Sequence, residues 1–177
     1  MIFSRVQGGS CDGIDSHKWN SYKSIFSKYS NIISKAGIEG VSYDLFARDC
    51  LWADVTNDLN PNTKAMINLD AETFIKNTKS NAANLILFDP PFSGRQAHDK
   101  YGSDNLYASD SSKISRITNE FQRVLKPGGY VIKLGYNSTK IKNLEIVEIV
   151  IVNFGGSRND VIISVHKKMN YNILEDF

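Results

Sequence analysis

Two β-rich runs near the carboxyl end of the chain constrain its fold more than any other feature. Residues 145–152 (EIVEIVIV) and 160–166 (DVIISVH) are joined by residues 153–159, which are too few for a crossover helix. The two runs should therefore pair as an antiparallel hairpin. Upstream of them, helical and strand-like segments alternate, which is typical of a parallel sheet. The sequence predicts a mixed α/β sheet, parallel in the middle, with one antiparallel strand inserted near its end.

Apolar periodicity locates the upstream elements. Residues 17–35 have apolar side chains at three- and four-residue spacing, and Gly37 and Gly40 follow as terminators. Residues 84–88 (NLILF) are almost entirely apolar, as in a strand buried on both faces. Strands are also expected at 41–46, 54–57, 64–68 and 130–135, and helices at 70–78 and about 112–125, the last ended by the KPGG sequence at 126–129. We expect a single domain over 1–177, with an amino-terminal arm and helix at 1–40 and a core at 41–168.

Length and composition are those of an ordinary globular domain. The chain has 177 residues, of which 41% are hydrophobic and 23% charged, and its net charge of +2 is compatible with nucleic acid without arguing for it. No run approaches the roughly 20 apolar residues of a membrane span, and the amino terminus lacks a secretory signal, so we expect a cytoplasmic protein without membrane contact. Cys11 and Cys50 share no ligand spacing with the histidines, so we expect no metal and interpret both as buried thiols.

Polar residues follow several of the predicted strands. In an open α/β sheet, functional side chains lie just beyond the carboxyl ends of the strands. Residues 44–49, Asn57-Asp58, Asp70 and residues 89–92 occupy such positions. Carboxylates there suit a nucleoside ligand, because one carboxylate can accept both ribose hydroxyls and another acceptor can take the adenine amino group. Taken singly, Asp58 is more typical of a turn and Asp70 of a helix cap.

The Asp89-Pro90-Pro91-Phe92 sequence is more specific. Two prolines directly after a buried strand remove two amide donors and fix two backbone angles. The preceding carbonyls are therefore left available as hydrogen-bond acceptors and point in fixed directions. The amino group of adenine or cytosine is a poor nucleophile because its lone pair is delocalised into the ring. A carboxylate and a carbonyl that accept its two hydrogens would draw the nitrogen towards tetrahedral geometry. Phe92 offers an aromatic face for a flipped base, although a turn with a buried aromatic is the simpler alternative.

These residues resemble those of a known protein family. NLILFDPPF (84–92) resembles the D-P-P-[YF] motif of amino-group DNA methyltransferases, and LKPGGYVI (125–132) is similar to the following segment in class I methyltransferases. Residues 43–61 resemble the methionine- and ribose-binding segments, 68–75 the adenine-binding segment, and 153–168 the closing hairpin. The combination resembles most closely small phage- and plasmid-associated adenine-specific DNA methyltransferases. It implies a three-layer, Rossmann-like class I methyltransferase fold, S-adenosylmethionine as cofactor, and N6 of adenine in DNA as acceptor.

The resemblance also implies roles for individual residues. Asp89 and the Pro90 carbonyl would hold the target amino group in a loop kept rigid by Pro91, and Phe92 would stack on the base. Residues expected to bind the cofactor are Asp44, Phe46, Ala47, Arg48 and Asp49 at its methionine end, Asn57 and Asp58 at the ribose, and Asp70 and Ala71 at the adenine. One departure is clear: the usual F-x-G-x-G loop has glycines, whereas residues 46–50 (FARDC) have none. Arg5 or Gly8-Gly9 could therefore complete the pocket.

The acceptor remains open at this point. Arg95, Lys100 and Tyr101 follow the catalytic loop and could contact phosphates and bases, or form an ordinary solvated loop. The same type of motif also serves RNA and protein glutamine acceptors, and the missing glycines would suit a binding protein that has lost its cofactor. The chain has no segment large enough for a separate target-recognition domain, so recognition is short, or comes from a partner or a homodimer.

Overall fold

The structure, a computed structural model, describes residues 1–7, 17–92, 98, 102, 111–153 and 159–170. Within them, seven strands form one sheet in the order β1-β6-β7-β5-β4-β2-β3. The strands are β1 (Ile2–Gln7), β2 (Val41–Asp44), β3 (Val55–Thr56), β4 (Ala83–Phe88), β5 (Leu125–Gly135), β6 (Glu145–Asn153) and β7 (Val161–Lys167). The helices are α1 (His17–Lys35), α2 (Ala71–Asn77) and α4 (Ser111–Val124).

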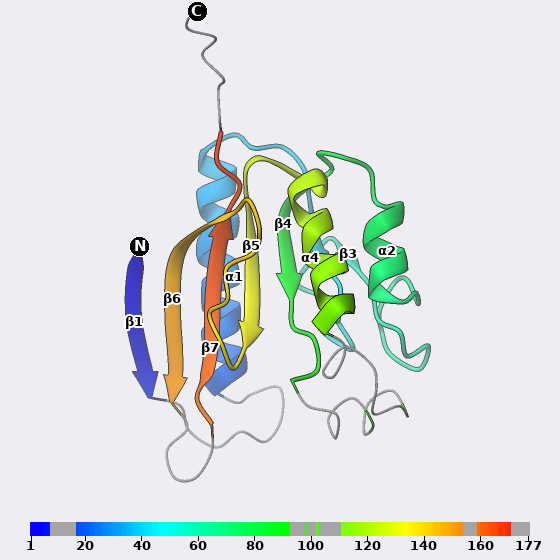
Figure 1. Ribbon diagram of the computed structural model, residues 1–177, viewed down its shortest axis with the longest axis horizontal. Helices are drawn as coiled ribbons and strands as arrows, with labels where there is room; N and C mark the ends of the chain where they lie inside the picture. Colours follow the sequence, from blue (N-terminus) through cyan, green and yellow to red (C-terminus); the bar gives the residue numbers. More distant parts are fainter. Residues whose placement is uncertain (8–16, 93–97, 99–101, 103–110, 154–158, 171–177) are drawn as a thin grey trace, which may run out of the picture.

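Strand β7 gives the sheet its mixed character. It lies between β5 and β6 and pairs antiparallel with both, whereas the other neighbouring strands pair parallel. Figure 1 shows β7 running against its neighbours. The predicted hairpin and the inserted antiparallel strand are therefore confirmed.

The helices cover the two faces of the sheet and make three layers. Helix α1 lies on one face, while α2 and α4 lie side by side on the other (Figure 1). Each helix forms because its apolar side chains recur on one side and are buried: Tyr22, Ile25, Tyr29 and Ile33 on α1, and Ile117, Phe121 and Val124 on α4. Strand β4 is buried on both faces, which explains its nearly continuous apolar sequence.

The first residues are the largest departure from expectation. We expected an arm at the amino terminus, but Ile2–Gln7 form strand β1, which pairs parallel with β6 along its whole length. These six residues, which include Ser4 and Arg5, have no clear apolar alternation, so no strand was predicted there. The strand forms because the otherwise open edge of β6 supplies a ladder of backbone partners.

Two other boundaries differ from the prediction. The strand expected at 64–68 is reduced to a single parallel bridge between Asn57 and Ile67. Strand β5 begins at Leu125 rather than at 130, because the KPGG sequence lies inside the strand as an irregularity. Leu125 pairs with Ala83 before the irregularity, and Gly128 within it has a φ of 81°, which a residue with a side chain rarely adopts.

The parallel strands β2, β3, β4 and β5 end at the same side of the sheet, shown at the bottom of Figure 1. Helix α4 also begins there, since it follows the loop after β4. The described strand-end residues among those predicted to be functional therefore lie at one end of the sheet. No described helix is long and apolar enough to span a bilayer.

Candidate active site

Three carboxyl groups gather where strands β2, β3 and β4 end. Asp44 is 4% exposed and Asp58 is fully buried, while Asp89 is half-buried. The pKa of Asp44 is raised to about 8, mainly by burial and also by the charges of Asp89 and Asp58, against a hydrogen bond from the Phe46 amide that lowers it. The Asp44 carboxyl is therefore mainly neutral at pH 7, and this end of the sheet has a negative potential that would favour a cation.

The segment after β2 is fixed by residues at the ends of two strands. The Phe46 amide donates to Asp44 Oδ1 at 3.0 Å, and the Arg48 amide donates to Asp58 Oδ2 at 3.0 Å. Between them, the Ala47 amide donates to the Asn57 carbonyl at 2.9 Å. Phe46 and Ala47 are buried, and the Phe46 ring packs edge-on against Phe88 at 5.6 Å. These bonds hold the 46–48 backbone close to the strand ends without any glycine.

Arg48 occupies the position of the first glycine in the F-x-G-x-G pattern, and its φ is 49°. That angle lies in the left-handed region, which glycine adopts freely and other residues adopt at a cost of roughly 1–2 kcal/mol. The glycine-free loop thus keeps the backbone conformation that a glycine would have. Arg48 and Asp49 are exposed, and Asp49 Oδ1 accepts the Lys64 amide at 3.0 Å.

Asn57 and Asp58 brace the loops around them. The Asn57 amide donates to the carbonyls of Leu45 at 3.2 Å and Leu69 at 3.0 Å, and its oxygen accepts the Leu69 amide at 3.1 Å. The second Asp58 oxygen accepts the Asn60 amide at 2.9 Å. Both residues are fully buried, so a ligand could reach them only if a covering segment moved. Their direct contact with a cofactor stays a prediction.

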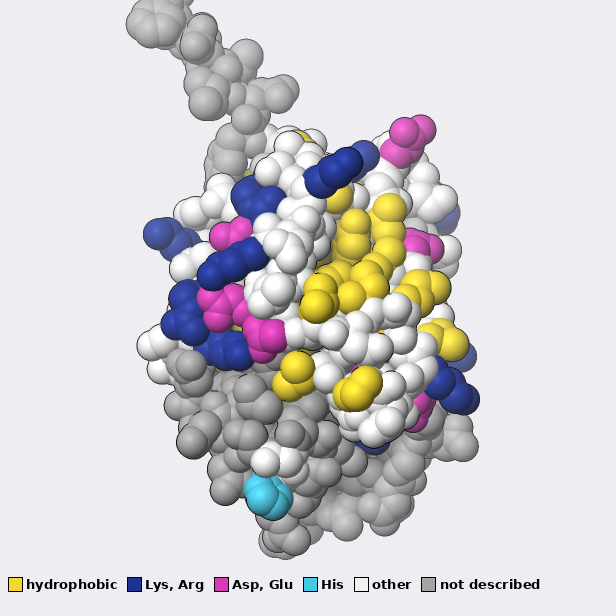
Figure 2. Space-filling model, turned by 90° about the vertical axis from the view of Figure 1, so that its right-hand side faces the viewer, with side chains coloured by type: hydrophobic (Ala, Val, Ile, Leu, Met, Phe, Trp, Pro, Cys, Tyr) yellow, Lys and Arg dark blue, Asp and Glu magenta, His cyan; other side chains and the backbone are white. Residues whose placement is uncertain are grey.

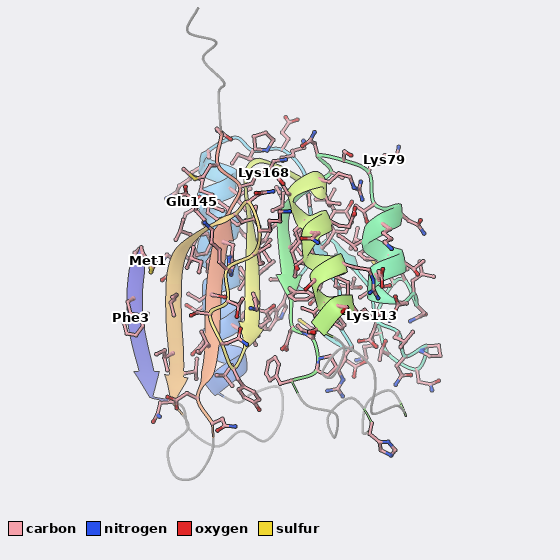
Figure 3. All side chains as sticks on the ribbon, viewed as in Figure 1. Met1, Phe3, Lys79, Lys113, Glu145 and Lys168 are labelled. Carbon is pink, nitrogen blue, oxygen red and sulfur yellow. The ribbon has the colours of Figure 1, made fainter. Side chains whose placement is uncertain are left out.

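Asp70 caps helix α2, as its sequence context indicated. One carboxylate oxygen accepts the amides of Glu72 at 3.1 Å and Thr73 at 3.4 Å, and the other accepts Lys113 Nζ at 2.6 Å. Lys113 reaches Asp70 from the first turn of α4, at the lower end of that helix in Figure 3. Figure 2 shows acidic and basic side chains gathered on the side of α2 and α4. Ala71, the first residue of α2, is buried, and binding of the cofactor adenine by Asp70 or Ala71 stays a prediction.

The loop after β4 separates the acidic end from a cavity. Pro90 and Pro91 are buried and, with Phe92, form one wall of a cavity of about 420 Å³; Asp89 does not line it. The Phe92 ring lies 4.9 Å from the ring of Tyr136, which is half-exposed beyond the end of β5. Asp89 lies instead near Asp44, whose pKa its charge helps to raise.

The opposite wall of the cavity carries hydrogen-bond donors and cations. It is formed by the start of α4 and the segment after β5, with Ser111, Ser115, Lys133, Asn137 and Lys140 among its residues. Lys133 Nζ donates to Asn137 Oδ1 at 3.2 Å and to the Thr139 carbonyl at 3.3 Å, and burial lowers the pKa of Lys133. Among the described residues, no Asp or Glu lines this cavity.

Helix α1 brings a tyrosine to the acidic end. Tyr22 is buried, and burial together with the charges of Asp44 and Asp89 raises the pKa of its hydroxyl well above the ordinary value. Cys50 lies in the same field, and burial first of all raises the pKa of its thiol to about 11. A thiol that stays protonated at neutral pH is a poor nucleophile. Cys50 is half-buried rather than buried as expected, and Cys11 lies outside the described residues.

Sequence reasoning missed the residues at the end of β5. Lys133, Tyr136 and Asn137 follow or interrupt an apolar strand, as the acidic residues do at the other strands, and the strand-end rule could have found them. The predicted substrate-contacting residues Arg95, Lys100 and Tyr101 lie outside the described residues, as do Gly8-Gly9 and the side chain of Arg5. The described His, Cys, Asp and Glu residues form no group that could hold a metal ion.

Comparisons with known proteins identify the fold. No protein family model matches the chain, and no curated protein matches it in sequence. Among solved structures, the Escherichia coli protein yhhF, described as a methyltransferase, has a TM-score of 0.52 and 11% identity over 85% of each chain. A Haemophilus influenzae protein described as a methylase has a TM-score of 0.53 and 12% identity, over 83% of this chain and 98% of that one.

A third similar structure contains a ligand. The N-methyltransferase NodS from Bradyrhizobium japonicum WM9, in complex with S-adenosyl-L-homocysteine, has a TM-score of 0.53 and 12% identity, over 86% of this chain and 88% of that one. At this identity the likeness concerns the fold. The chain therefore has the Rossmann-like, class I fold of these methyltransferases, as the sequence resemblance implied.

Proposed function

We propose that this protein is an S-adenosylmethionine-dependent methyltransferase that modifies the exocyclic amino group of a nucleic-acid base, most suitably N6 of adenine in DNA. The observation that carries the proposal is the position of the Asp89-Pro90-Pro91-Phe92 loop. It follows strand β4, which lies between β5 and β2, at the carboxyl end of a methyltransferase fold, with the acidic strand ends on one side and a nucleotide-sized cavity on the other. The fold of NodS, which binds S-adenosyl-L-homocysteine, supports the choice of cofactor.

The acidic end fits the charge of this cofactor. S-adenosylmethionine carries a sulfonium and an ammonium group, and the potential from Asp58 and Asp89 that raises the pKa of Asp44 would favour both. Residues 44–49 would hold the methionine end, Asn57 and Asp58 the ribose, and Asp70 with Ala71 the adenine. Because Asp44 and Asp58 are buried, entry of the cofactor requires a covering segment to move. The left-handed backbone at Arg48 supports the same assignment, since it retains the shape of a glycine loop.

The catalytic loop would position the acceptor amino group. Asp89 and the carbonyl of Pro90 accept its two hydrogens, which directs the nitrogen lone pair away from the ring. Bound S-adenosylmethionine supplies an activated methyl group. The buried prolines keep the two acceptors in place, so the loop needs little reorganisation during the reaction. After transfer the methylated nitrogen is more acidic and loses its proton readily, so the site needs no strong base.

Phe92 and Tyr136 would hold the ring of the base. Their rings are in contact at 4.9 Å, and Tyr136 is 49% exposed, so it can turn aside while Phe92 keeps its packing against the core. Stacking on aromatic side chains contributes roughly 1–3 kcal/mol per base. Recognition of the surrounding sequence would come from a second copy of the chain, from a partner, or from the residues between 93 and 110.

Incubation with labelled S-adenosylmethionine and unmethylated DNA, RNA or protein, followed by nucleoside and amino-acid analysis, tests the proposal. We expect label in N6-methyladenine from DNA. Label found only in RNA or in a protein glutamine would contradict the assignment of DNA as the acceptor, while the proposed methyltransferase activity would stand. Absence of both transfer and heat on titration with the cofactor at high micromolar concentration would show a binding protein with a methyltransferase fold.

A further inference from the structure

The cavity behind the Pro90-Pro91 turn differs in chemistry from the rest of the site. Its polar side chains are hydroxyls, one amide and two ammonium groups, and no described carboxylate lines it. We propose that this cavity binds a phosphate group of the nucleic-acid strand that carries the target base, with Lys133 as its principal ligand. This inference rests on the proposed function and adds to it how the strand is held.

Lys133 has the bonding capacity that such a ligand requires. An ammonium has three N–H donors, and within the described residues Lys133 uses two of them, on the neutral oxygens of Asn137 and Thr139. These contacts are 3.2 and 3.3 Å long, whereas an ammonium and an anionic oxygen typically approach to roughly 2.7–2.9 Å. A phosphate oxygen would therefore replace weak neutral partners with a strong charged one.

A second observation supports a positive potential here. His166 is fully buried on strand β7, and its pKa is lowered to about 4 by burial first and then by the charges of Lys133 and Lys140. The imidazole is therefore neutral at pH 7 and adds no charge of its own. The two lysines act on the same small region from β5 and from the segment beyond it, and no Asp or Glu among the described residues lines the cavity beside them.

Because the cavity adjoins the catalytic loop, the phosphate that it would bind is the one attached to the target base. Pro90, Pro91 and Phe92 form its wall, and Asp89 begins the same loop on the acidic side. A base held at Phe92 and Asp89 would leave its sugar and phosphate on the cavity side of the loop. A volume of about 420 Å³ exceeds that of a phosphate alone and leaves room for the attached sugar. The hydroxyl of Ser111 at the start of α4 adds a further donor, whereas the hydroxyl of Ser115 donates to the Ser111 carbonyl at 2.8 Å.

Binding of short single strands measures this contact without catalysis. The probes are fluorescein-labelled DNA and RNA oligonucleotides of about 12 residues, with fluorescence anisotropy read from about 50 to 200 mM salt. We expect Lys133→Met to weaken DNA binding by about tenfold and to reduce the slope of log affinity against log salt by about one. Lys133→Arg should keep most of the affinity. Lys79→Met removes the same charge at the opposite end of the sheet (Figure 3) and should change little.

The phosphate itself is tested by a DNA strand with uncharged methylphosphonate links, on which Lys133→Met should have no effect. Equal affinity and equal salt slope for wild type and Lys133→Met, with matching thermal unfolding, would overturn the inference, as would a wild type that binds neither strand. If only RNA binds in a way that depends on Lys133, the proposed phosphate site stands and the bound strand is RNA. If Lys133-dependent binding persists while no acceptor is methylated, the proposed function fails and the phosphate site stands.

Discussion

The two sides of the Asp89–Phe92 loop differ in charge although both lie at the carboxyl end of one sheet. On the side of β2 and β3, the charges of Asp58 and Asp89 create a negative potential around the mainly neutral Asp44 carboxyl. On the side of β5, Lys133 and Lys140 create a positive one. The sheet order explains the separation, because β4 lies between β2 and β5 and its loop stands between their ends.

If both proposals hold, this separation brings two oppositely charged ligands to one loop. A negative potential favours a cation, and a positive potential favours an anion. Pro90 and Pro91 lie between the two sides. Their fixed backbone angles keep the loop from shifting towards either side. Four predictions test whether the two sides act as described, from the largest expected effect to the smallest.

Removal of the carboxylate that faces the acidic side should have the largest effect. We expect Asp89→Ala to lower methyl transfer by about 10²–10³-fold or more, because a positioned acceptor at the reacting group is lost. Thermal unfolding should change little, since Asp89 is half-buried and contributes no core packing. Asp89→Asn keeps one acceptor oxygen and should recover part of the rate. Full activity of Asp89→Ala would contradict the mechanism.

One titratable group on each side of the loop should change how the free energy of unfolding depends on pH. The pKa of Asp44 is raised to about 8 in the folded state, so its contribution is present at low pH and is lost as pH rises from 4 to 8. The pKa of His166 is lowered to about 4, so its contribution is lost as pH falls from 6.5 to 4. The two slopes oppose each other between pH 4 and 6.5, and between 6.5 and 8 only the decline from Asp44 remains.

Urea unfolding of the wild type from pH 4 to 9 should therefore give a plateau followed by a decline of up to about 1.4 kcal/mol per pH unit between 6.5 and 8. Asp44→Asn should remove that decline and leave a rise below pH 6.5, because the asparagine oxygen can still accept the Phe46 amide. His166→Asn should extend the decline down to pH 4. A decline between pH 6.5 and 8 that survives Asp44→Asn would show that another group causes it.

Phe92 should affect the acceptor more than the cofactor. We expect Phe92→Ala to raise the DNA concentration needed for half-maximal transfer by about tenfold, because a stacking face is lost. The cofactor affinity measured by calorimetry should stay within about twofold. Ile32→Ala, which removes a partly exposed apolar side chain on α1, is a matched control for loss of surface. Equal losses of both affinities would show that Phe92 packs against the cofactor instead.

The smallest effect should come from the backbone at Arg48. Arg48→Gly should change the free energy of unfolding by less than about 1 kcal/mol, because relief of the left-handed strain is offset by a more flexible unfolded chain. Arg48→Val should destabilise by about 1–2 kcal/mol, because a β-branched side chain is disfavoured at that angle. Urea unfolding of the three proteins decides this. A valine variant as stable as the wild type would show that the loop has another conformation.

The periodicity of the apolar residues was enough to predict most of the helices and strands. The helices at 17–35 and 70–78, strand β4 and the terminal hairpin were all predicted, since burial on one or both faces leaves a clear apolar pattern. Strand β1 and the start of β5 were not, because one depends on a long-range partner and the other on an irregularity inside a strand. The acidic strand ends were found from the sequence. Lys133 and Tyr136 were missed, because their importance depends on which elements face them across the cavity.

The angle at Arg48 has a wider consequence. A comparison by letters finds no glycine motif at residues 46–50, whereas Arg48 has the left-handed φ that glycine favours, and amide contacts to Asp44, Asn57 and Asp58 hold the segment. Backbone shape is therefore a better criterion than glycine-based signatures for recognising segments of this kind.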